Sequence, residues 1–232
     1  MLWITDDNFF ADRKWAVGVL EAIIASDIKY KFVIQARYEV GFDDEMLELL
    51  KKAGFVQLAM GIEFLEDEAF ESNDKNCTYD DIVRSVENIK AHGLSVRGLF
   101  IVGADNHKKG VGKRLADFVI KYDITGVLIQ SMYFIPGTKA YETHKDKLIH
   151  TDWSKYNGNV VHYPELISPA ELQKEIIIAS KTIYSPKRLV TETIKRRGIE
   201  RVLFFGEFFW QWDVRRKLAK EIKFLKLTSR KM

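Results

Sequence analysis

The sequence predicts an α/β protein in which parallel strands alternate with helices, followed by a mostly helical C-terminal part. One pattern recurs five times: a short apolar segment, a polar or glycine-containing exit, and a segment with apolar residues at helical spacing. The 232 residues are 47% hydrophobic and 12% aromatic, which is enough for a sizeable core. Near Thr151 the composition changes, and several tryptophans follow. We therefore predict a β/α domain over residues 1–150 and a helical extension over residues 151–232.

The predicted strands indicate where ligand-binding residues are expected. They cover residues 2–5, 32–35, 56–60, 96–102 and 126–132. In proteins of this kind, ligands bind at the carboxyl ends of the parallel strands. Leu2, Trp3 and Ile4 are interpreted as a buried strand, and Asp6 and Asp7 follow it. Because two adjacent carboxylates are costly to bury, they are expected to face a cleft, a cation or a ligand.

The second and third strands also end in charged residues. Arg37 follows the second strand and has two interpretations: a ligand-binding residue, or a partner of Glu39 or of a neighbouring helix in an ion pair. Glu63 follows the third strand, two residues after Gly61. Because a glycine lets another group approach the backbone closely, we expect Glu63 at the ligand-binding edge of the sheet.

The last two strands end in glycine-containing turns. Gly98 lies inside the fourth strand and Gly103 ends it, which suggests that a ligand or a neighbouring group approaches the backbone there. Pro136 and Gly137 follow the fifth strand and predict a sharp turn. The glycines of residues 108–113 lack the spacing of a phosphate-binding loop, so this segment is interpreted as the start of a helix.

Capping residues predict where the helices begin. The proposed caps are Asp12, Asp43 or Asp44, Thr78 with Asp81, Ser168 with Pro169 and Glu171, and Ser185 with Pro186. The first helix is expected to face the core with Trp15, Val19, Leu20, Ile23 and Ile24. The final helix is predicted from near Phe209, after a helix that Gly198 ends, and it is basic from Arg215 onward. The aromatic residues around Phe209 are expected to cover an end or edge of the strand-helix domain.

Composition excludes several classes of protein. The net charge of +3 indicates no strong attraction to nucleic acid. Cys77 is the single cysteine, so the chain can form neither an internal disulfide nor a cysteine-only metal site. We predict no metal site from the histidines, which are scattered: His92, His107, His144, His150 and His162. With no apolar segment near the ~20 residues of a membrane span and no signal peptide, a cytoplasmic protein is expected.

Taken together, the strand ends resemble those of the radical S-adenosylmethionine (radical SAM) enzymes. They are Asp6-Asp7-Asn8-Phe9, Gln35-Ala36-Arg37, Gly61-Ile62-Glu63, Phe100-Ile101-Val102-Gly103 and Pro136-Gly137-Thr138. The branch that usually carries an N-terminal cobalamin-binding domain is the most similar, and further residues support it: Lys51-Lys52-Ala53-Gly54-Phe55, Asn73, Lys75 and Asp152-Trp153. The core resemblance covers about residues 1–145, and the rest resembles the family's C-terminal extension.

The resemblance implies a partial β/α barrel, with about five of the six parallel strands present, that binds SAM beside a four-iron, four-sulfur cluster. In that family the reduced cluster cleaves SAM to a 5′-deoxyadenosyl radical, while the protein positions the reactants. Asp6 and Asp7 match acids near the SAM amine, and Arg37 and Glu63 match residues that hold its carboxylate or ribose. The remaining matches are Gly98 and Gly103 by the adenine, and Pro136 and Gly137 in the turn after the last strand.

Three departures from the family pattern bear on function. The family's cluster is held by three cysteines after the first barrel strand, in a Cys-x3-Cys-x2-Cys motif, and this sequence contains neither that strand nor that motif. Cys77 matches no cluster ligand. His107-Lys108 stands where relatives more often have Asp-Thr, and Phe64 stands where a small polar residue often follows the glutamate. The chain is therefore expected to be the C-terminal part of such an enzyme, inactive alone and dependent on an upstream cluster-binding segment.

Two alternatives to this enzymatic hypothesis stay open. One is a non-catalytic remnant or partner subunit that binds SAM or another protein. The other is a module whose aromatic and basic tail binds a membrane surface or RNA. The substrate is expected to be an unidentified small molecule. The sequence leaves open whether the complete protein uses cobalamin and which reaction it catalyses.

Overall fold

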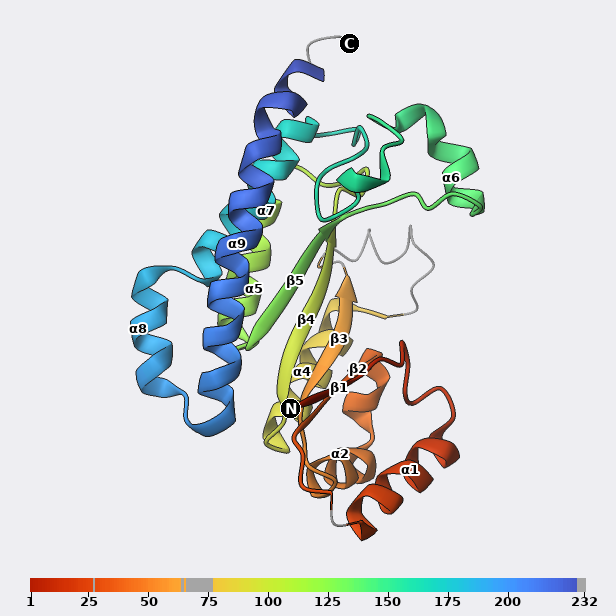
Figure 1. The fold of residues 1–232 in the computed structure, drawn as a ribbon, viewed down its shortest axis with the longest axis vertical. Coiled ribbons are helices and arrows are strands. Elements are labelled where there is room, and N and C mark those ends of the chain that lie inside the picture. Colours follow the sequence, from red (N-terminus) through yellow and green to blue (C-terminus); the bar gives the residue numbers. More distant parts are fainter. Residues whose placement is uncertain (27, 64, 66–76, 229–232) are drawn as a thin grey trace. The chain divides into compact units, whose positions relative to one another are not determined.

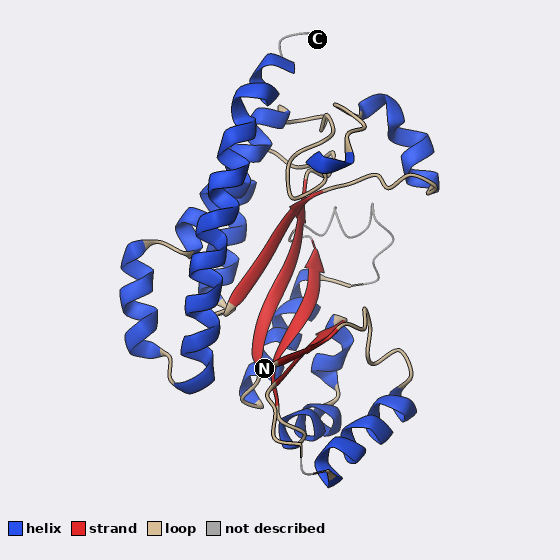
Figure 2. Cartoon of the chain, viewed as in Figure 1, coloured by secondary structure: helices blue, strands red, loops and turns tan. Residues whose placement is uncertain are grey.

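The computed structural model describes residues 1–26, 28–63, 65 and 77–228, and it contains one five-stranded sheet. The strands are β1 (Leu2–Ile4), β2 (Phe32–Ala36), β3 (Phe55–Glu63), β4 (Ser95–Val102) and β5 (Gly126–Ser131). They run parallel and lie in the order β1-β2-β3-β4-β5, with helical segments in the connections (Figures 1 and 2). Every predicted strand is present within a few residues of its expected position, so the predicted partial β/α barrel is confirmed.

The chain forms two compact units, which we describe separately. The first contains residues 1–99, 122–128 and 198–203, and the second contains residues 100–121, 129–197 and 204–232. These units are defined by compactness and not by independent folding. The boundary predicted near Thr151 therefore stays a prediction.

Helices of the first unit begin where the sequence predicts. They are α1 (Arg13–Ala25), the 3-10 helix η1 (Tyr38–Phe42), α2 (Asp44–Lys52) and α4 (Tyr79–Ala91). The Asp12 carboxylate accepts the Trp15 N–H, and Thr78 and Asp81 form the predicted reciprocal capping box. Of the two candidate caps for α2, the structure selects Asp43. Each such cap stabilises its helix by roughly 1 kcal/mol, because it pairs a backbone N–H that the helix leaves unpaired.

The predicted burial of the N-terminal segment is wrong. The structure places Trp3 44% exposed and Trp15 51% exposed, although both were expected to face the core. In α1 the fully buried positions are Ala16 and Leu20, while Ile24 faces solvent. The physical reason is position in the sheet: β1 is the first strand in the order and pairs with β2 alone among the described strands. An edge strand of this kind has fewer neighbours to cover its side chains.

The second unit is mostly helical. Its helical segments are α5 (Val111–Lys121), α6 (Lys139–His144), η2 (Lys145–Lys147), η3 (Trp153–Lys155), α7 (Pro169–Ile183), α8 (Pro186–Lys195) and most of α9 (Gly198–Thr228). Helix α5 begins within residues 108–113, the segment interpreted as a helix start, and its Gly112 lets it approach α7 closely. A Cβ at Gly112 would lie 2.1 Å from the Glu175 carbonyl oxygen, and the Gly112 N–H donates to the Glu175 carboxylate at 2.9 Å.

The predicted start of the last helix is also wrong. Gly198 was expected to end α8, but α8 ends at Lys195 and Gly198 begins α9. The aromatic segment around Phe209 is therefore helical. Within the second unit, Phe204 and Phe208 are buried on one face of α9, and the Phe204 ring lies 5.7 Å from the Tyr184 ring at the end of α7. Packing of its apolar face on other helices stabilises α9 over this greater length. No helix in the described parts of the chain is long and apolar enough to cross a membrane.

Candidate functional site

The carboxyl ends of β1, β2 and β3 lie at one edge of the first unit. Asp6 and Asp7 follow β1, and Arg37 follows β2 directly. The register pairs Ile4 of β1 with Ile34 of β2, and Ala36 of β2 with Met60 of β3. From Met60, β3 continues to Glu63. The four predicted charged residues of this unit are therefore presented at the same edge of the sheet, as expected from parallel strands.

Glu63 has an unusual backbone conformation. Its φ of 63° lies in the left-handed region, which a residue with a Cβ seldom adopts. Its carboxylate turns back over Gly61. If Gly61 carried a Cβ, that atom would lie 3.3 Å from Glu63 Oε1. Such conformations cost roughly 1–3 kcal/mol and are concentrated at functional sites. The end of β3 therefore places the half-buried Glu63 carboxylate next to the Gly61 backbone.

Arg37 forms the ion pair that the sequence left open as an alternative. Its Nη2 lies 2.8 Å from Glu39 Oε1, and the two side chains are 67% and 47% exposed. An exposed pair of this kind stabilises the fold by about 0–1 kcal/mol. The guanidinium can therefore exchange Glu39 for an anionic ligand at little cost. The pair neither requires nor excludes the ligand-binding interpretation.

The two acids after β1 differ in their local bonding. Asp6 Oδ1 accepts the Asn8 N–H at 2.9 Å, which closes a short turn after the strand. Asp6 and Asp7 are both exposed, and the prediction that they face a cleft, a cation or a ligand stays a prediction. Because carboxylates only accept hydrogen bonds when ionised, this pair is suited to bind an ammonium or hydroxyl group.

The glycine inside β4 and the glycine that directly follows it have different surroundings. Gly98 is buried within the strand, in the first unit. Gly103 follows the strand, in the second unit, with a φ of 102°. A Cβ at Gly103 would lie 2.9 Å from both His162 Cε1 and Leu172 Cδ2. The close approach that the sequence predicted at Gly103 is therefore made by neighbouring side chains.

Two histidines bond to the Gly103 peptide groups, which the sequence did not reveal. His107 Nδ1 accepts the Gly103 N–H at 2.9 Å, and His162 Nε2 donates to the Gly103 carbonyl oxygen at 2.9 Å. Both imidazoles are buried. Burial lowers the pKa of His162, which favours its neutral form. The two histidines are far apart in the sequence and no spacing rule relates them, so only the tertiary fold shows that they hold one glycine.

Pro136 and Gly137 form the sharp turn that was predicted after β5. Gly137 has a φ of 84°, and the Thr138 N–H donates to the Ile135 carbonyl oxygen at 3.1 Å across the turn. Thr138 then caps α6 by accepting the Tyr141 N–H. Proline followed by a glycine with positive φ is the pattern of a type II turn. Both predicted residues are exposed and belong to the second unit.

The residues present do not fit an iron–sulfur cluster. Cys77, the one cysteine of the sequence, is buried beside the N-terminal cap of α4. Three cysteine thiolates are needed when SAM completes the coordination of such a cluster. Over residues 1–26, 28–63, 65 and 77–228, no group of three or more His, Cys, Asp or Glu side chains could hold a metal ion. Asn73 and Lys75, which contributed to the resemblance, lie outside the described residues, as does Phe64, which departs from the family pattern.

Comparison with known proteins identifies the family. The model of the radical SAM superfamily matches residues 2–118. The bacteriochlorophyllide d C-12(1)-methyltransferase of Chlorobaculum tepidum is 24% identical over 183 residues, which are 77% of this chain and 39% of that protein. The anaerobic magnesium-protoporphyrin IX monomethyl ester cyclase of Cereibacter sphaeroides is 24% identical over 209 residues, 88% of this chain and 34% of that protein. The chain thus spans well under half the length of these relatives.

Solved structures show the same fold. The radical SAM methyltransferase TsrM from Kitasatospora setae, with cobalamin and a [4Fe-4S] cluster bound, matches 75% of this chain and 34% of its own at 18% identity and a TM-score of 0.53. The cobalamin-dependent SAM radical enzyme OxsB matches 93% of this chain and 39% of its own at 14% identity and a TM-score of 0.57. The chain belongs to the radical SAM superfamily, as the strand-end residues indicated.

Proposed function

We propose that the carboxyl edge of β1–β3 binds SAM. Asp6 and Asp7 bind its amino group, Arg37 binds its carboxylate, and Glu63 accepts hydrogen bonds from the ribose hydroxyls. The adenine lies by Gly98 in the same unit. The roles of Gly103, Pro136 and Gly137, which belong to the second unit, remain predictions from family resemblance.

The observation that most directly supports this proposal is the conformation of Glu63. A left-handed glutamate at the end of a buried strand is strained, and its carboxylate lies over a glycine that leaves space for another group. The other donors suit a zwitterion, since acids complement an ammonium and a guanidinium complements a carboxylate. Arg37 is held by one exposed ion pair, which a ligand carboxylate can replace.

We further propose that the cluster ligands come from outside these 232 residues. The chain lacks the required thiolates, so it supplies the SAM-binding side of the complete enzyme, with SAM and the cluster providing the radical chemistry when both are bound. The two curated relatives named above are a methyltransferase and a cyclase. We therefore place the reaction among methyl transfers and ring closures on a small molecule. Cobalamin is the proposed additional cofactor if the reaction is a methyl transfer.

Calorimetric titration with SAM tests the binding site. We expect the 232-residue chain to bind SAM weakly, and Glu63→Gln to weaken binding about tenfold to hundredfold, the equivalent of one charge-assisted hydrogen bond of roughly 1.5–3 kcal/mol. Glu87→Gln is the matched control, because Glu87 is exposed on α4 in the same unit and lies at no strand end. Absence of SAM binding by the wild-type chain, or equal losses in the two variants, would overturn the proposal.

A further inference from the structure

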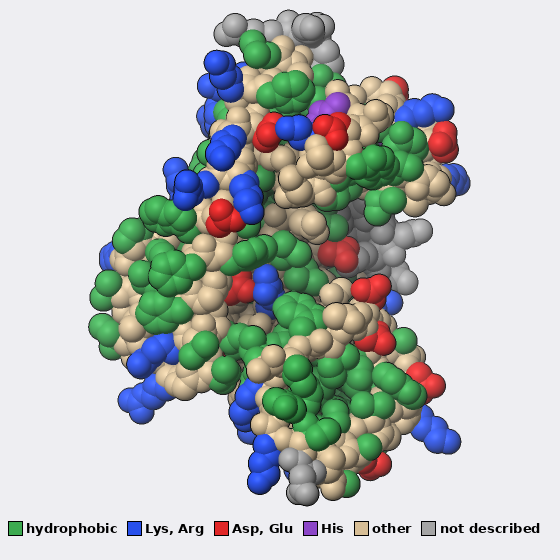
Figure 3. All heavy atoms as spheres, viewed as in Figure 1, with side chains coloured by type: hydrophobic (Ala, Val, Ile, Leu, Met, Phe, Trp, Pro, Cys, Tyr) green, Lys and Arg blue, Asp and Glu red, His purple; other side chains and the backbone are tan. Residues whose placement is uncertain are grey.

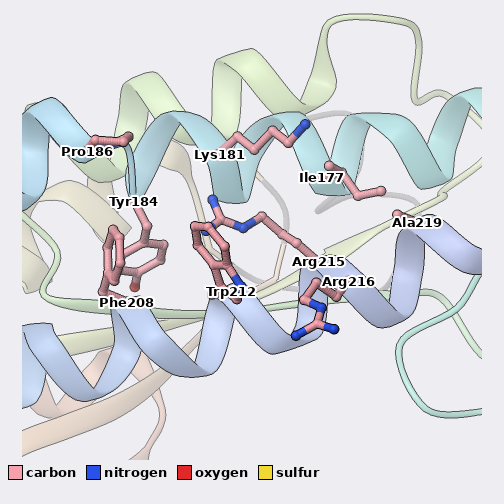
Figure 4. Close-up of a pocket in the computed structure, with 9 residues that line it drawn as sticks. All are labelled: Ile177, Lys181, Tyr184, Pro186, Phe208, Trp212, Arg215, Arg216 and Ala219. Carbon is pink, nitrogen blue, oxygen red and sulfur yellow. The ribbon is translucent and has the colours of Figure 1, made fainter.

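A cavity of about 460 Å³ lies within the second unit. Figure 4 shows it between α7 and α9, near the start of α8. Its lining residues are Ile177, Lys181, Tyr184, Pro186, Phe208, Trp212, Arg215, Arg216 and Ala219. The volume is in the range of pockets that hold small molecules. None of these residues belongs to the proposed SAM site.

The cavity has an apolar and aromatic lining. Tyr184 and Phe208 are buried at one end, and Ile177 comes from the facing helix. Trp212 is 54% exposed, although it extends from α9 toward α7 in Figure 4. A large aromatic side chain that lines a cavity and remains half in water can bury more of its surface when a ligand binds. This surface is suited to an apolar or planar molecule.

Three cations line this cavity, and one of them, Arg216, interacts electrostatically with the Asp213 carboxylate on the same helix. In the described part of the chain, no ion pair is formed by Lys181, Arg215 or Arg216. Arg215 is partly desolvated, which lowers its pKa, and its guanidinium lies 5.7 Å from the centre of the Trp212 ring. A partly desolvated guanidinium is costly when no anion is near. Binding of an anion would offset this cost.

The nearby charges do not supply that anion. Asp213, the acidic residue between Trp212 and Arg215 on α9, already pairs with Lys217 at 2.6 Å. From Arg215 to its C-terminal end α9 is basic, and Figure 3 shows Lys and Arg side chains gathered over this part of the helix. Cationic side chains beside an exposed apolar cavity complement a molecule that has one apolar part and one anionic end.

We propose that this cavity binds a small amphiphilic anion, an apolar molecule that ends in a carboxylate. The apolar part lies against Trp212, Phe208 and Ile177. The carboxylate pairs with Arg215, whose planar guanidinium group suits a two-oxygen anion and lies beside Trp212 in Figure 4. The inference is independent of the proposed SAM site, because every lining residue lies on or beside α7, α8 and α9.

A pair of probes with equal chain length and opposite charge tests the proposal. Decanoate and decyltrimethylammonium are titrated into the 232-residue chain, with binding followed by calorimetry and by tryptophan fluorescence. We expect decanoate to bind and to change the fluorescence, and the cation to bind at least tenfold more weakly. Trp212→Phe should remove most of the fluorescence change while leaving the heat of binding. Equal affinity for both probes would overturn the proposal, since it would indicate non-specific apolar binding.

Variants separate the cavity from general surface charge. Arg215→Gln should weaken decanoate binding about tenfold to hundredfold, because one charge-assisted contact is lost. Lys220→Gln is the matched control, since Lys220 is an exposed cation on the same helix that does not line the cavity. Ala219→Phe keeps every charge but fills the cavity, and it should also abolish binding. Similar losses in Lys220→Gln, no loss in Ala219→Phe, or binding to anionic vesicles but not to decanoate would each overturn the proposal.

Discussion

The N-terminal strand and helix differ from the C-terminal helices in which side chains they bury. Around β1 and α1, large apolar side chains such as Trp3, Trp15 and Ile24 lie at the surface. In α7 and α8 the opposite occurs, and polar side chains such as Gln173 and Glu192 are buried. The difference shows that hydrophobicity alone does not decide burial in this protein. The number of packing neighbours and the pairing of polar groups decide it.

Gln173 shows how a buried polar group of the second unit is paired. Gln173 donates to the Asn159 side chain and the Leu218 carbonyl oxygen, and it accepts the Val160 N–H at 2.8 Å. One amide side chain therefore links a loop to α7 and α9. A buried amide costs little when all of its bonds are made, and it specifies one arrangement of the segments that it joins.

The largest loss of stability is expected when the buried Glu192 carboxylate of α8 is replaced by a neutral group. The Glu192 carboxylate lies 2.8 Å from the Arg188 guanidinium and 2.8 Å from Arg196, and its side chain is 8% exposed. Glu192→Gln keeps the size but removes the carboxylate that contacts both guanidiniums, one of them on the buried Arg196 side chain. We expect a loss of about 3–5 kcal/mol in the free energy of unfolding, measured by urea denaturation.

The control for this variant is an exposed pair in the same unit. Glu142→Gln removes the partner of Lys145, and both side chains are about two-thirds exposed, at 63% and 62%. Its cost should be below about 1 kcal/mol, because water screens the pair. If the two variants lose the same stability, the contrast between buried and exposed charge fails for the second unit.

Two substitutions in α1 test the contrast in the first unit. Leu20→Ala removes a fully buried side chain and should cost about 2–5 kcal/mol. Ile24→Ser, one turn later on the same helix, exchanges a surface side chain and should change the free energy of unfolding by about 0.5 kcal/mol or less. Thermal or urea unfolding gives both values. A loss of more than 2 kcal/mol for Ile24→Ser would mean that this surface is covered in the folded protein.

A smaller effect is expected from pH. Burial lowers the pKa of His162 below its usual 6.5, so the folded chain holds a neutral imidazole where the unfolded chain binds a proton. As pH falls below about 6.5, the unfolded state takes up the proton first, and the free energy of unfolding decreases. One such group gives a slope of up to about 1.4 kcal/mol per pH unit.

Urea unfolding between pH 7 and pH 5 measures this slope. His162→Gln should reduce the slope, because glutamine does not titrate and can still donate to the Gly103 carbonyl oxygen. His150, whose pKa burial also lowers, contributes a slope of its own, so His150→Gln is the comparison variant. An unchanged slope in His162→Gln would show that His162 does not titrate with folding.

Local signals in the sequence determined the elements and the edge where the candidate site lies. Capping residues such as Asp12 and Thr78 act within a few residues, and parallel strands present their ends at one edge whatever the helices do. The ion pair of Arg37 with Glu39 was also foreseen, as one of two alternatives, because the residues are close in sequence.

Only the tertiary structure decided which side chains are buried and which distant residues meet. The exposure of Trp3 follows from the edge position of β1, which no apolar pattern encodes. The bonds of His107 and His162 to Gly103, and the cavity around Arg215, join side chains that are separated by many residues. Such contacts depend on how segments pack, and packing is a property of the whole chain and not of any local stretch.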